Sequence, residues 1–278
     1  MVLSDVRADR FAGKVAMVTG AGSGMGAAVA RQLAAEGVRA VVLVDVNAEG
    51  LAAVAEELSQ LREPPLAGPA AEPVTLDVAD AAGVDGAVQD VLRRHGRLDI
   101  LVHAAGVDDP EVKRRIADAL AAGRPAEVTG SLDDASWRRV MRVNLDGTFH
   151  VLRAAVRAMR PAGGGAIVVI GSSSAFDTPA GYPHYAASKA GVHALSQAVA
   201  KEVIASGVRV NVVAPGPTET GMAVRTPASL RAGFADPGVR PYATPEEIAG
   251  IALFLASDAA ANLVGAVLLA NGGRFTVA

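Results

Sequence analysis

The sequence Lys14-Val-Ala-Met-Val-Thr-Gly-Ala-Gly-Ser-Gly-Met-Gly26 decides the fold of this chain. Its first half is a short apolar run of the kind that forms a buried strand, and its second half has a glycine at every other position. An alanine-rich stretch of helical composition follows from Ala27 to Glu36 and stops at Gly37. Glycine permits a positive φ and close backbone approach, and a helix N-terminus offers free N–H groups to an anion. A strand, a glycine turn and a helix in this order predict a dinucleotide-binding loop.

A second apolar run, residues 40–44, ends in Asp45. This residue lies about twenty positions beyond the glycine loop, where a carboxylate accepts hydrogen bonds from the ribose hydroxyls of a dinucleotide. A carboxylate there repels the 2′-phosphate of NADP, and neither Ser23 in the loop nor Val46 and Asn47 after the strand is basic. The sequence therefore predicts NAD as the cofactor in preference to NADP.

Short β-like runs alternate with longer helical runs along the rest of the chain, which is the pattern of a parallel sheet with helices on both faces. With 278 residues, the chain suits one α/β domain over 1–278 that buries a large core. We expect strands centred on 15–19, 40–45, 73–76, 99–103, 166–170, 208–213 and 266–269. We expect helices over 24–36, 48–61, 80–95, 133–160, 185–205 and 245–256, and a proline-rich connector over 63–69.

The segment Tyr185-Ala-Ala-Ser-Lys189 is alanine-rich and places Tyr and Lys at i and i+4. On a helix this spacing puts both side chains on one face, one turn apart. A phenol ordinarily ionises near pH 10, and a nearby ammonium stabilises the phenolate. At about 4 Å and an effective dielectric of about 20 the pair interacts by roughly 4 kcal/mol, which would lower the pKa of Tyr185 by up to about three units. The spacing predicts a general acid/base that works near neutral pH, although the same spacing also occurs in ordinary surface pairs of Tyr and Lys.

These residues resemble the short-chain dehydrogenase/reductase family over nearly the whole chain, from about Lys14 to Gly273. The segment Thr19–Gly26 matches the family's Thr-Gly-x-x-x-Gly-x-Gly loop, and Ser172, 13 residues before Tyr185, matches the position of its active-site serine. Asn144, in Arg-Val-Asn-Leu, falls where the family keeps an asparagine. The resemblance implies a Rossmann-type, doubly wound parallel sheet of about seven strands in the order 3-2-1-4-5-6-7. It also implies the catalytic residues Asn144, Ser172, Tyr185 and Lys189, and no metal.

The same resemblance implies cofactor contacts that are spread along the chain. Asp77 resembles the residue that holds the adenine, and Pro215-Gly216 resembles the turn beside the nicotinamide. Two departures are visible: the family's Asn-Asn-Ala-Gly is residues 103–106 (His-Ala-Ala-Gly), which removes a side-chain amide at Ala104, and Thr218 replaces the usual Val or Ile. The implied cofactor-binding residues are Gly20, Ser23, Gly24, Met25, Gly26, Asp45, Asp77, Val78, Ala104, Ala105, Gly106, Tyr185, Lys189, Pro215, Gly216, Thr218 and Thr220.

The chemistry that the resemblance implies is that of an NAD-dependent oxidoreductase (EC 1.1.1.-) that interconverts a secondary alcohol and a ketone. Ser172 and Tyr185 contact the substrate, the first by holding its oxygen and the second by taking or giving the proton. Lys189 lowers the pKa of Tyr185 and binds the nicotinamide ribose, and Asn144 holds a water that links Lys189 to solvent. The alternatives are an NADPH-dependent carbonyl or 3-oxoacyl reductase and a non-catalytic NAD-binding regulatory protein. The family also implies a homotetramer, or a homodimer, built on helices near 133–160 and 185–205.

Composition and charge exclude several other classes of protein. The absence of cysteine rules out disulfides and thiolate chemistry, and the five histidines show no metal-ligand spacing. A net charge of −3 argues against nucleic acid and anionic membranes as partners. Every apolar run is shorter than the ~20 residues of a membrane span, and residues 1–10 lack the pattern of a signal peptide. We therefore expect a cytoplasmic protein whose partner is a small-molecule alcohol or ketone, and we expect His184 to face solvent rather than the pocket.

The segment 108–133 is longer than the family usually needs. Asp109-Pro110 is a good helix start, and Val112, Ile116 and Leu120 follow at four-residue spacing, so we expect an inserted amphipathic helix over 110–122. Two interpretations stay open for this helix. It is either a surface excursion that packs its apolar stripe on the body, or a wall over the substrate pocket or a subunit contact.

A second variable segment, 217–240, follows Pro215-Gly216 and matches the position of the family's substrate lid. It carries little regular pattern, as is usual for loops that close over a site. Its large apolar residues either contact an apolar substrate or anchor the lid on the core; they are Met222, Leu230 and Phe234.

Overall fold

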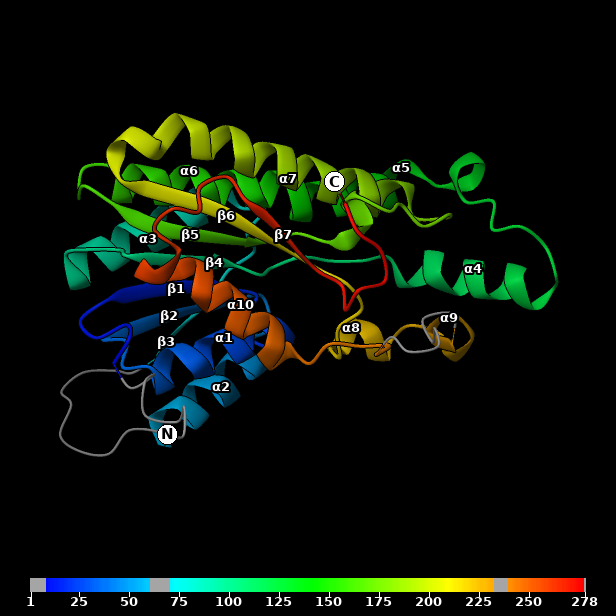
Figure 1. Cartoon of the computed structure of the whole chain (residues 1–278). Helices are drawn as coiled ribbons and strands as arrows, with labels where there is room; N and C mark the ends of the chain where they lie inside the picture. The colour runs from blue at the N-terminus through cyan, green and yellow to red at the C-terminus, as the bar shows by residue number, and fades with distance from the viewer. Residues whose placement is uncertain (1–8, 61–70, 233–239, 278) are drawn as a thin grey trace, which may run out of the picture.

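A computed structural model describes residues 9–60, 71–232 and 240–277, and it contains one seven-stranded parallel sheet. The strand order is β3-β2-β1-β4-β5-β6-β7, which confirms the order predicted from the sequence (Figure 1). The connector expected over 63–69 and Phe234 lie outside the described residues. The strands are β1 (Val15–Thr19), β2 (Ala40–Asp45), β3 (Ala71–Thr75), β4 (Ile100–His103), β5 (Gly165–Ile170), β6 (Val208–Pro215) and β7 (Val267–Ala270).

Helices cover both faces of the sheet, as the alternating pattern predicts (Figure 1). The long helices are α1 (Gly24–Ala35), α2 (Ala48–Gln60), α3 (Ala81–His95), α4 (Pro110–Ala121), α5 (Asp134–Met141), α6 (Gly147–Met159), α7 (Pro183–Val203) and α10 (Pro245–Ala256). Two short helices, α8 (Gly221–Val224) and α9 (Ala228–Ala232), lie in the segment before α10. Among the described residues, no helix combines the length and the apolar character that a bilayer crossing requires.

The sheet divides the interior into two apolar layers. On β1, Ala16 and Val18 pack with α1, α2 and α10, whereas Val15 and Met17 pack on the opposite face with α3, α6 and α7. All of these strand residues are buried, because successive side chains point to opposite faces and both faces are covered. This burial explains why central strands such as β1 read as continuous apolar runs rather than as alternating ones.

The helix that was expected over 133–160 is not continuous. A π-helical turn over residues 142–146 separates α5 from α6, and Asn144 lies at its centre. A π turn inserts an extra residue into the helix and rotates the side chains on one side of it relative to the other. No local pattern in the sequence distinguishes this turn from a regular helix, so the prediction of one uninterrupted helix was wrong here.

The predicted helix in the segment 108–133 is confirmed as α4. Asp109 caps it, since its Oδ1 accepts hydrogen bonds from the N–H groups of Glu111 and Val112, and Pro110 occupies its first turn. Val112 and Ile116 form a small apolar cluster, separate from the two main layers, with Val128. Helix α4 extends beyond the edge of the sheet, beside α9 (Figure 1). It therefore does not pack on the main core.

Candidate active site

The glycine loop lies at the carboxyl edge of the sheet, between β1 and α1. Gly20 has φ 70°, and a Cβ at this position would lie 2.7 Å from the backbone nitrogen of Ala105. Gly24 has φ 53° and faces Thr220, whose Cγ2 would be 3.1 Å from an added Cβ. The two positions require glycine, because a side chain would be strained and would collide with the neighbouring backbone or Thr220.

Asp45 points from the end of β2 into this loop. Its Oδ2 accepts a hydrogen bond from the Gly22 N–H at 3.0 Å, and its Oδ1 accepts one from the Asn47 N–H at 3.0 Å. The predicted pairing of loop and carboxylate is therefore present in space. Asp77, after β3, is held by the Ala79 N–H at 2.9 Å and by an ion pair with Arg142 at 3.2 Å, and Val78, the next residue, is buried.

The first turn of α1 has no side-chain cap. Ser23 occupies the N-cap position, but its hydroxyl makes no capping hydrogen bond, and no acidic residue lies in the first turn. A helix start of this kind leaves backbone N–H groups available for an anion. Together with the close approach at Gly20 and the carboxylate of Asp45, this turn fits the pyrophosphate and ribose of a dinucleotide.

The departure at residues 103–106 has a structural explanation. His103 is fully buried, with Nδ1 2.7 Å from Thr19 Oγ1 and Nε2 3.0 Å from Thr148 Oγ1. Burial, together with the nearby charge of Lys189, lowers the pKa of His103 to about 3, so the ring is neutral. It links β1, β4 and α6 behind the loop that carries Ala104, Ala105 and Gly106. Sequence reasoning assigned no role to this histidine.

The four predicted catalytic residues come from three elements that meet at the ends of β5 and α7. Lys189 Nζ donates to the carbonyl of Ile170, the last residue of β5, at 3.0 Å. Asn144 Nδ2 donates to Ser188 Oγ at 3.0 Å, and the Ser188 hydroxyl donates to the carbonyl oxygen of Tyr185 at 2.7 Å. The Asn144 amide also exchanges two hydrogen bonds with the backbone of Val107, at 2.8 and 3.0 Å.

The predicted pKa of Tyr185 is wrong in direction. Burial raises the pKa of Tyr185, a hydrogen bond with the Ser172 side chain opposes this rise, and the negative charge of Asp108 adds to it. Lys189 Nζ lies 5.9 Å from the centre of the Tyr185 ring, and burial also lowers the pKa of Lys189, to about 8. The i+4 spacing placed the two groups together as expected. Removal from water, which the spacing does not reveal, decides the sign.

Two further histidines on α7 support the site. His193 Nε2 accepts a hydrogen bond from the Ser172 N–H at 3.3 Å, and burial followed by the charge of Lys189 lowers the pKa of His193 to about 4. His184 has no solvent exposure, and its Nε2 lies 3.3 Å from Asp109 Oδ2. The expectation that His184 faces solvent was wrong, because α4 and its capping aspartate cover this part of α7.

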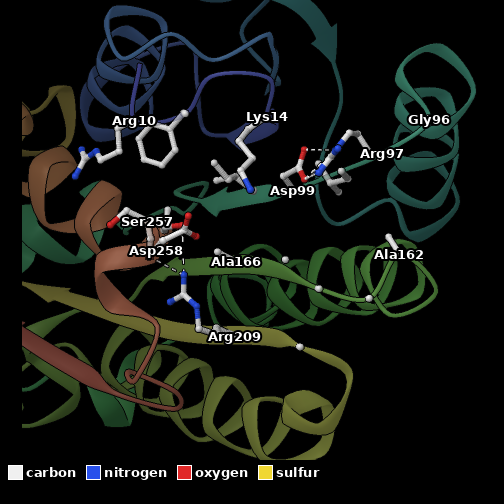
Figure 2. A pocket seen from close by; sticks show the side chains of 18 residues that line it. Arg10, Lys14, Gly96, Arg97, Asp99, Ala162, Ala166, Arg209, Ser257 and Asp258 are labelled. Atoms are coloured by element: carbon white, nitrogen blue, oxygen red, sulfur yellow. Dashed lines mark hydrogen bonds and ion pairs between the residues drawn. The ribbon is translucent and has the colours of Figure 1, made fainter. Parts of the chain in front are cut away.

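One pocket of about 380 Å³ joins these groups at the carboxyl edge. Ser172 and Tyr185 line it, as do Asp108 and Lys113 from the start of the inserted segment. The turn after β6 forms another wall through Pro215, Gly216, Thr218 and Thr220, and Met25 of the glycine loop and Met222 of α8 complete it. A larger cavity of about 520 Å³ lies at the opposite, amino edge and contains none of the predicted site residues (Figure 2).

Comparison with known proteins places the chain in a family. The family model of the short chain dehydrogenases matches residues 14–230. The D-threitol dehydrogenase of Mycolicibacterium smegmatis is 42% identical over 267 residues, 95% of this chain and 94% of that protein. The cis-4-hydroxycyclohexanecarboxylate dehydrogenase of Sinomonas cyclohexanicum is 40% identical over 270 residues, 97% and 99% of the two chains. The 3-oxoacyl-[acyl-carrier-protein] reductase FabG of Escherichia coli is 33% identical over 268 residues, which cover 96% of this chain and 99% of that protein.

A solved structure gives the same result. A short-chain type dehydrogenase/reductase from Mycobacterium ulcerans superposes with a TM-score of 0.83 at 33% identity, covering 95% of this chain and 90% of that one. This chain therefore belongs to the short-chain dehydrogenase/reductase family. It is an oxidoreductase of the alcohol/ketone type that uses a nicotinamide cofactor.

Proposed function

We propose that this protein is an NAD-dependent dehydrogenase that interconverts a secondary alcohol and a ketone. The observation that carries the proposal is the pairing of Ser172 and Tyr185 on the wall of one pocket, at the carboxyl edge where the glycine loop also ends. Ligands of open α/β sheets bind at this edge. The nicotinamide, when bound, supplies the hydride chemistry, and the protein orients the substrate beside it.

Ser172 would donate a hydrogen bond to the substrate oxygen and stabilise the charge that develops on it. Tyr185 would exchange the proton with the same oxygen. Because burial raises its pKa, the Tyr185 hydroxyl is protonated at neutral pH and ready to donate to a ketone. In the oxidation direction the ammonium of Lys189, one helical turn away, would stabilise the phenolate as the proton leaves the alcohol.

Asn144 is proposed to fix the geometry of this group from the π turn. Its amide is already bonded to Val107 and Ser188. The water through which it would link Lys189 to solvent must then bind its backbone carbonyl, which also accepts a hydrogen bond from Thr148 at 2.5 Å. Gly106 adjoins both groups, since an added Cβ would lie 3.3 Å from Asn144 Oδ1 and 3.5 Å from Lys189 Nζ.

The proposed preference for NAD rests on Asp45. Its carboxylate occupies the mouth of the glycine loop, where a 2′-phosphate would lie against a negative charge. The other contacts proposed for the cofactor are the N–H groups of the loop, Asp77 and Val78 for the adenine, residues 104–106, the side chains of Tyr185 and Lys189, and the turn at 215–220. Rates measured with NADH and NADPH in one assay test the preference.

An NADPH-dependent 3-oxoacyl reductase is the second candidate, and the 33% identity to FabG favours it. Two relatives at higher identity carry names of alcohol dehydrogenases, one for a polyol and one for a hydroxylated ring acid, and they favour the first candidate. A non-catalytic regulatory protein would not be expected to retain Asn144, Ser172, Tyr185 and Lys189 together.

We also propose a cytoplasmic homotetramer, or a homodimer, that binds neither nucleic acid nor membranes. Large apolar side chains on α5 and α6, the helices expected at the subunit contact, support an assembly: Trp137 is 40% and Phe149 is 46% exposed. We propose that the segment 108–133 forms a wall, and the segment 217–240 a lid, over the pocket of the same protomer; residues 233–239 of the lid lie outside the described residues. Light scattering on the purified protein measures the assembly.

The replacement Tyr185→Phe tests the proposed function. It removes one hydroxyl and should lower kcat by at least about a thousandfold, because proton transfer to the substrate oxygen is lost, while calorimetric NAD binding stays within about twofold. A matched control is Tyr242→Phe, which removes a hydroxyl that lines the same pocket but has no part in the proposed proton transfer. Wild-type rates in Tyr185→Phe, measured on a panel of secondary alcohols and ketones, would overturn the mechanism.

A further inference from the structure

The pocket wall contributed by the inserted segment carries a buried ion pair. Asp108 is 4% exposed and Lys113 is 8% exposed, and Lys113 Nζ lies 2.5 Å from Asp108 Oδ2. Both residues line the pocket with Ser172 and Tyr185. Charged groups that are removed from water need partners for all of their hydrogen-bonding capacity. Any capacity that the protein leaves unused therefore indicates which kind of ligand group the pocket can bind.

The ammonium of Lys113 has no capacity left. Besides Asp108 Oδ2, it contacts Thr226 Oγ1 at 2.7 Å and the carbonyl oxygen of Met222 at 3.4 Å. An ammonium has three donors, and these three acceptors account for them. Lys113 therefore ties α4 to the segment that begins with α8, and a carboxylate on a substrate would find no free donor on it.

The carboxylate of Asp108, unlike the ammonium of Lys113, still has capacity to accept hydrogen bonds. Its Oδ2 is held by the single contact to Lys113 Nζ, no other described residue donates a hydrogen bond to either of its oxygens, and Arg225 lies 3.9 Å from its Oδ1. A carboxylate accepts about four hydrogen bonds, so most of the lone pairs of Asp108 are unused. A buried acceptor that faces a pocket with unused lone pairs fits a ligand that brings a donor.

Asp108 also lies close to the proposed reaction centre. Its charge acts on the pKa of both Tyr185 and Tyr182, in addition to the larger effect of burial, and burial and Asp108 together raise the pKa of Tyr182 to about 12. Tyr182 in turn packs against the apolar cluster of α4. In a pocket of about 380 Å³, one small molecule can contact Tyr185 and Asp108 at the same time.

We propose that Asp108 is a specificity residue that accepts a hydrogen bond from a second hydroxyl group of the substrate. This inference rests on the proposed function and deepens it: the substrate is a neutral diol or polyol rather than a mono-alcohol or an alcohol that carries a carboxylate. A mono-alcohol leaves the buried lone pairs of Asp108 without donors, and a carboxylate brings only acceptors. Sites built to bond a substrate hydroxyl discriminate strongly against analogues that lack it.

The test compares butane-2,3-diol, butan-2-ol and 3-hydroxybutanoate as substrates of the full chain, with NAD and with NADP. We expect kcat/KM for the diol to exceed that for each of the other two by at least about tenfold. The double replacement Asp108→Leu with Lys113→Met removes both charges at once and avoids leaving one of them buried alone. It should bring the ratio of diol to mono-alcohol close to one.

Arg114→Met is the matched control, because Arg114 lies on the same helix with its side chain 65% exposed and paired to Glu111. It should leave the ratio unchanged. Equal wild-type rates for diol and mono-alcohol, preference for 3-hydroxybutanoate, or an unchanged ratio in the double variant would each overturn the inference.

Direct binding of the diol separates this inference from the proposed function. Saturation-transfer NMR on the wild-type chain should detect the diol more strongly than butan-2-ol, and the double variant should lose the difference. Binding with this pattern but without turnover would overturn the proposed function and leave the subsite standing. Binding without this pattern overturns the subsite, whatever the rates are.

Discussion

The cavities at the two edges of the sheet differ in what their charged groups do. At the amino edge, the cavity of about 520 Å³ is the larger, yet Arg97 is paired with Asp99 (Figure 2). Arg209 donates to four carbonyl oxygens at the end of α10 and just after it. At the carboxyl edge, the pocket of about 380 Å³ contains Tyr185, Ser172 and the incompletely bonded Asp108. The comparison teaches that a buried carboxylate with unused acceptor capacity, and not the size of the cavity, marks the candidate site.

Substitution of a glycine gives the largest expected difference between the edges. Gly20→Ala places a Cβ against Ala105 at a φ of 70°, so it should cost at least a hundredfold in dinucleotide affinity or prevent folding. Gly86→Ala is the control, because nothing lies within 4 Å of its added Cβ and α3 gains a better helix former. Calorimetric titration with NAD checks both. Unchanged affinity in Gly20→Ala would show that the loop is not the dinucleotide site.

His103 predicts how stability depends on pH. Its folded pKa of about 3 lies below the ordinary 6.5, so between these values the unfolded chain binds a proton that the folded chain does not. The contribution of the neutral, buried His103 to the free energy of unfolding is therefore fully present above pH 6.5. It decreases as the pH is lowered, by about 3 kcal/mol at pH 4.5. His103→Asn should lose less stability than wild type between pH 7 and pH 4.5 in denaturant titrations. Equal losses in both proteins would contradict the burial argument.

Replacement of Asp45 should have the next largest effect. Asp45→Ser removes the charge at the mouth of the loop and should shift the ratio of kcat/KM for NAD and NADP toward NADP by about 10- to 100-fold. The control is Asp77→Asn, which lies at the expected adenine position and should weaken both cofactors alike. A ratio that Asp45→Ser leaves unchanged would remove the basis for the proposed preference.

The smallest effect is expected at the amino edge. Arg209→Met deprives four carbonyl oxygens of their donor and should lower stability by about 1–2 kcal/mol, since water in the open cavity replaces part of the loss. Activity at a temperature where the protein is folded should stay within about twofold of wild type. Arg97→Met breaks the ion pair between the exposed Arg97 and Asp99, two residues along the chain, and should change neither stability nor activity. A large loss of activity in Arg209→Met would show that the two edges are coupled.

Most of the fold follows from short-range patterns in the sequence. The seven strands fall within two residues of their predicted positions. Most of them are buried parallel strands, which read as continuous apolar runs between helices, whereas the edge strand β3 (Ala-Glu-Pro-Val-Thr) is only partly apolar. Helix α4 was predicted from Asp109, Pro110 and an apolar repeat, all of which lie within one segment. The strand order came from the family resemblance, since no pattern within a strand shows which neighbour it pairs with.

The candidate site was predictable in part. The loop at 20–26 and the pair Tyr185 and Lys189 depend on spacing within one element, and the structure brings these residues to one edge of the sheet. The roles of His103 and His193 could not be found, because each depends on partners that are far away in sequence. The pKa of Tyr185 was predicted with the wrong sign because a pairwise charge was considered and burial was not.

The sequence by itself determined the local elements, because strand, turn and helix formation respond to neighbours a few positions away. Together with the family resemblance, it also pointed to the residues that we propose to carry the chemistry. The tertiary structure alone decided that Lys113 meets Thr226, 113 residues later, and that Asp108 is left with unused lone pairs in the pocket. It also decided which groups lose their contact with water. Desolvation and long-range pairing depend on residues that are far apart in the sequence and meet only in the packed molecule. For this reason they cannot be predicted from any single segment of the sequence.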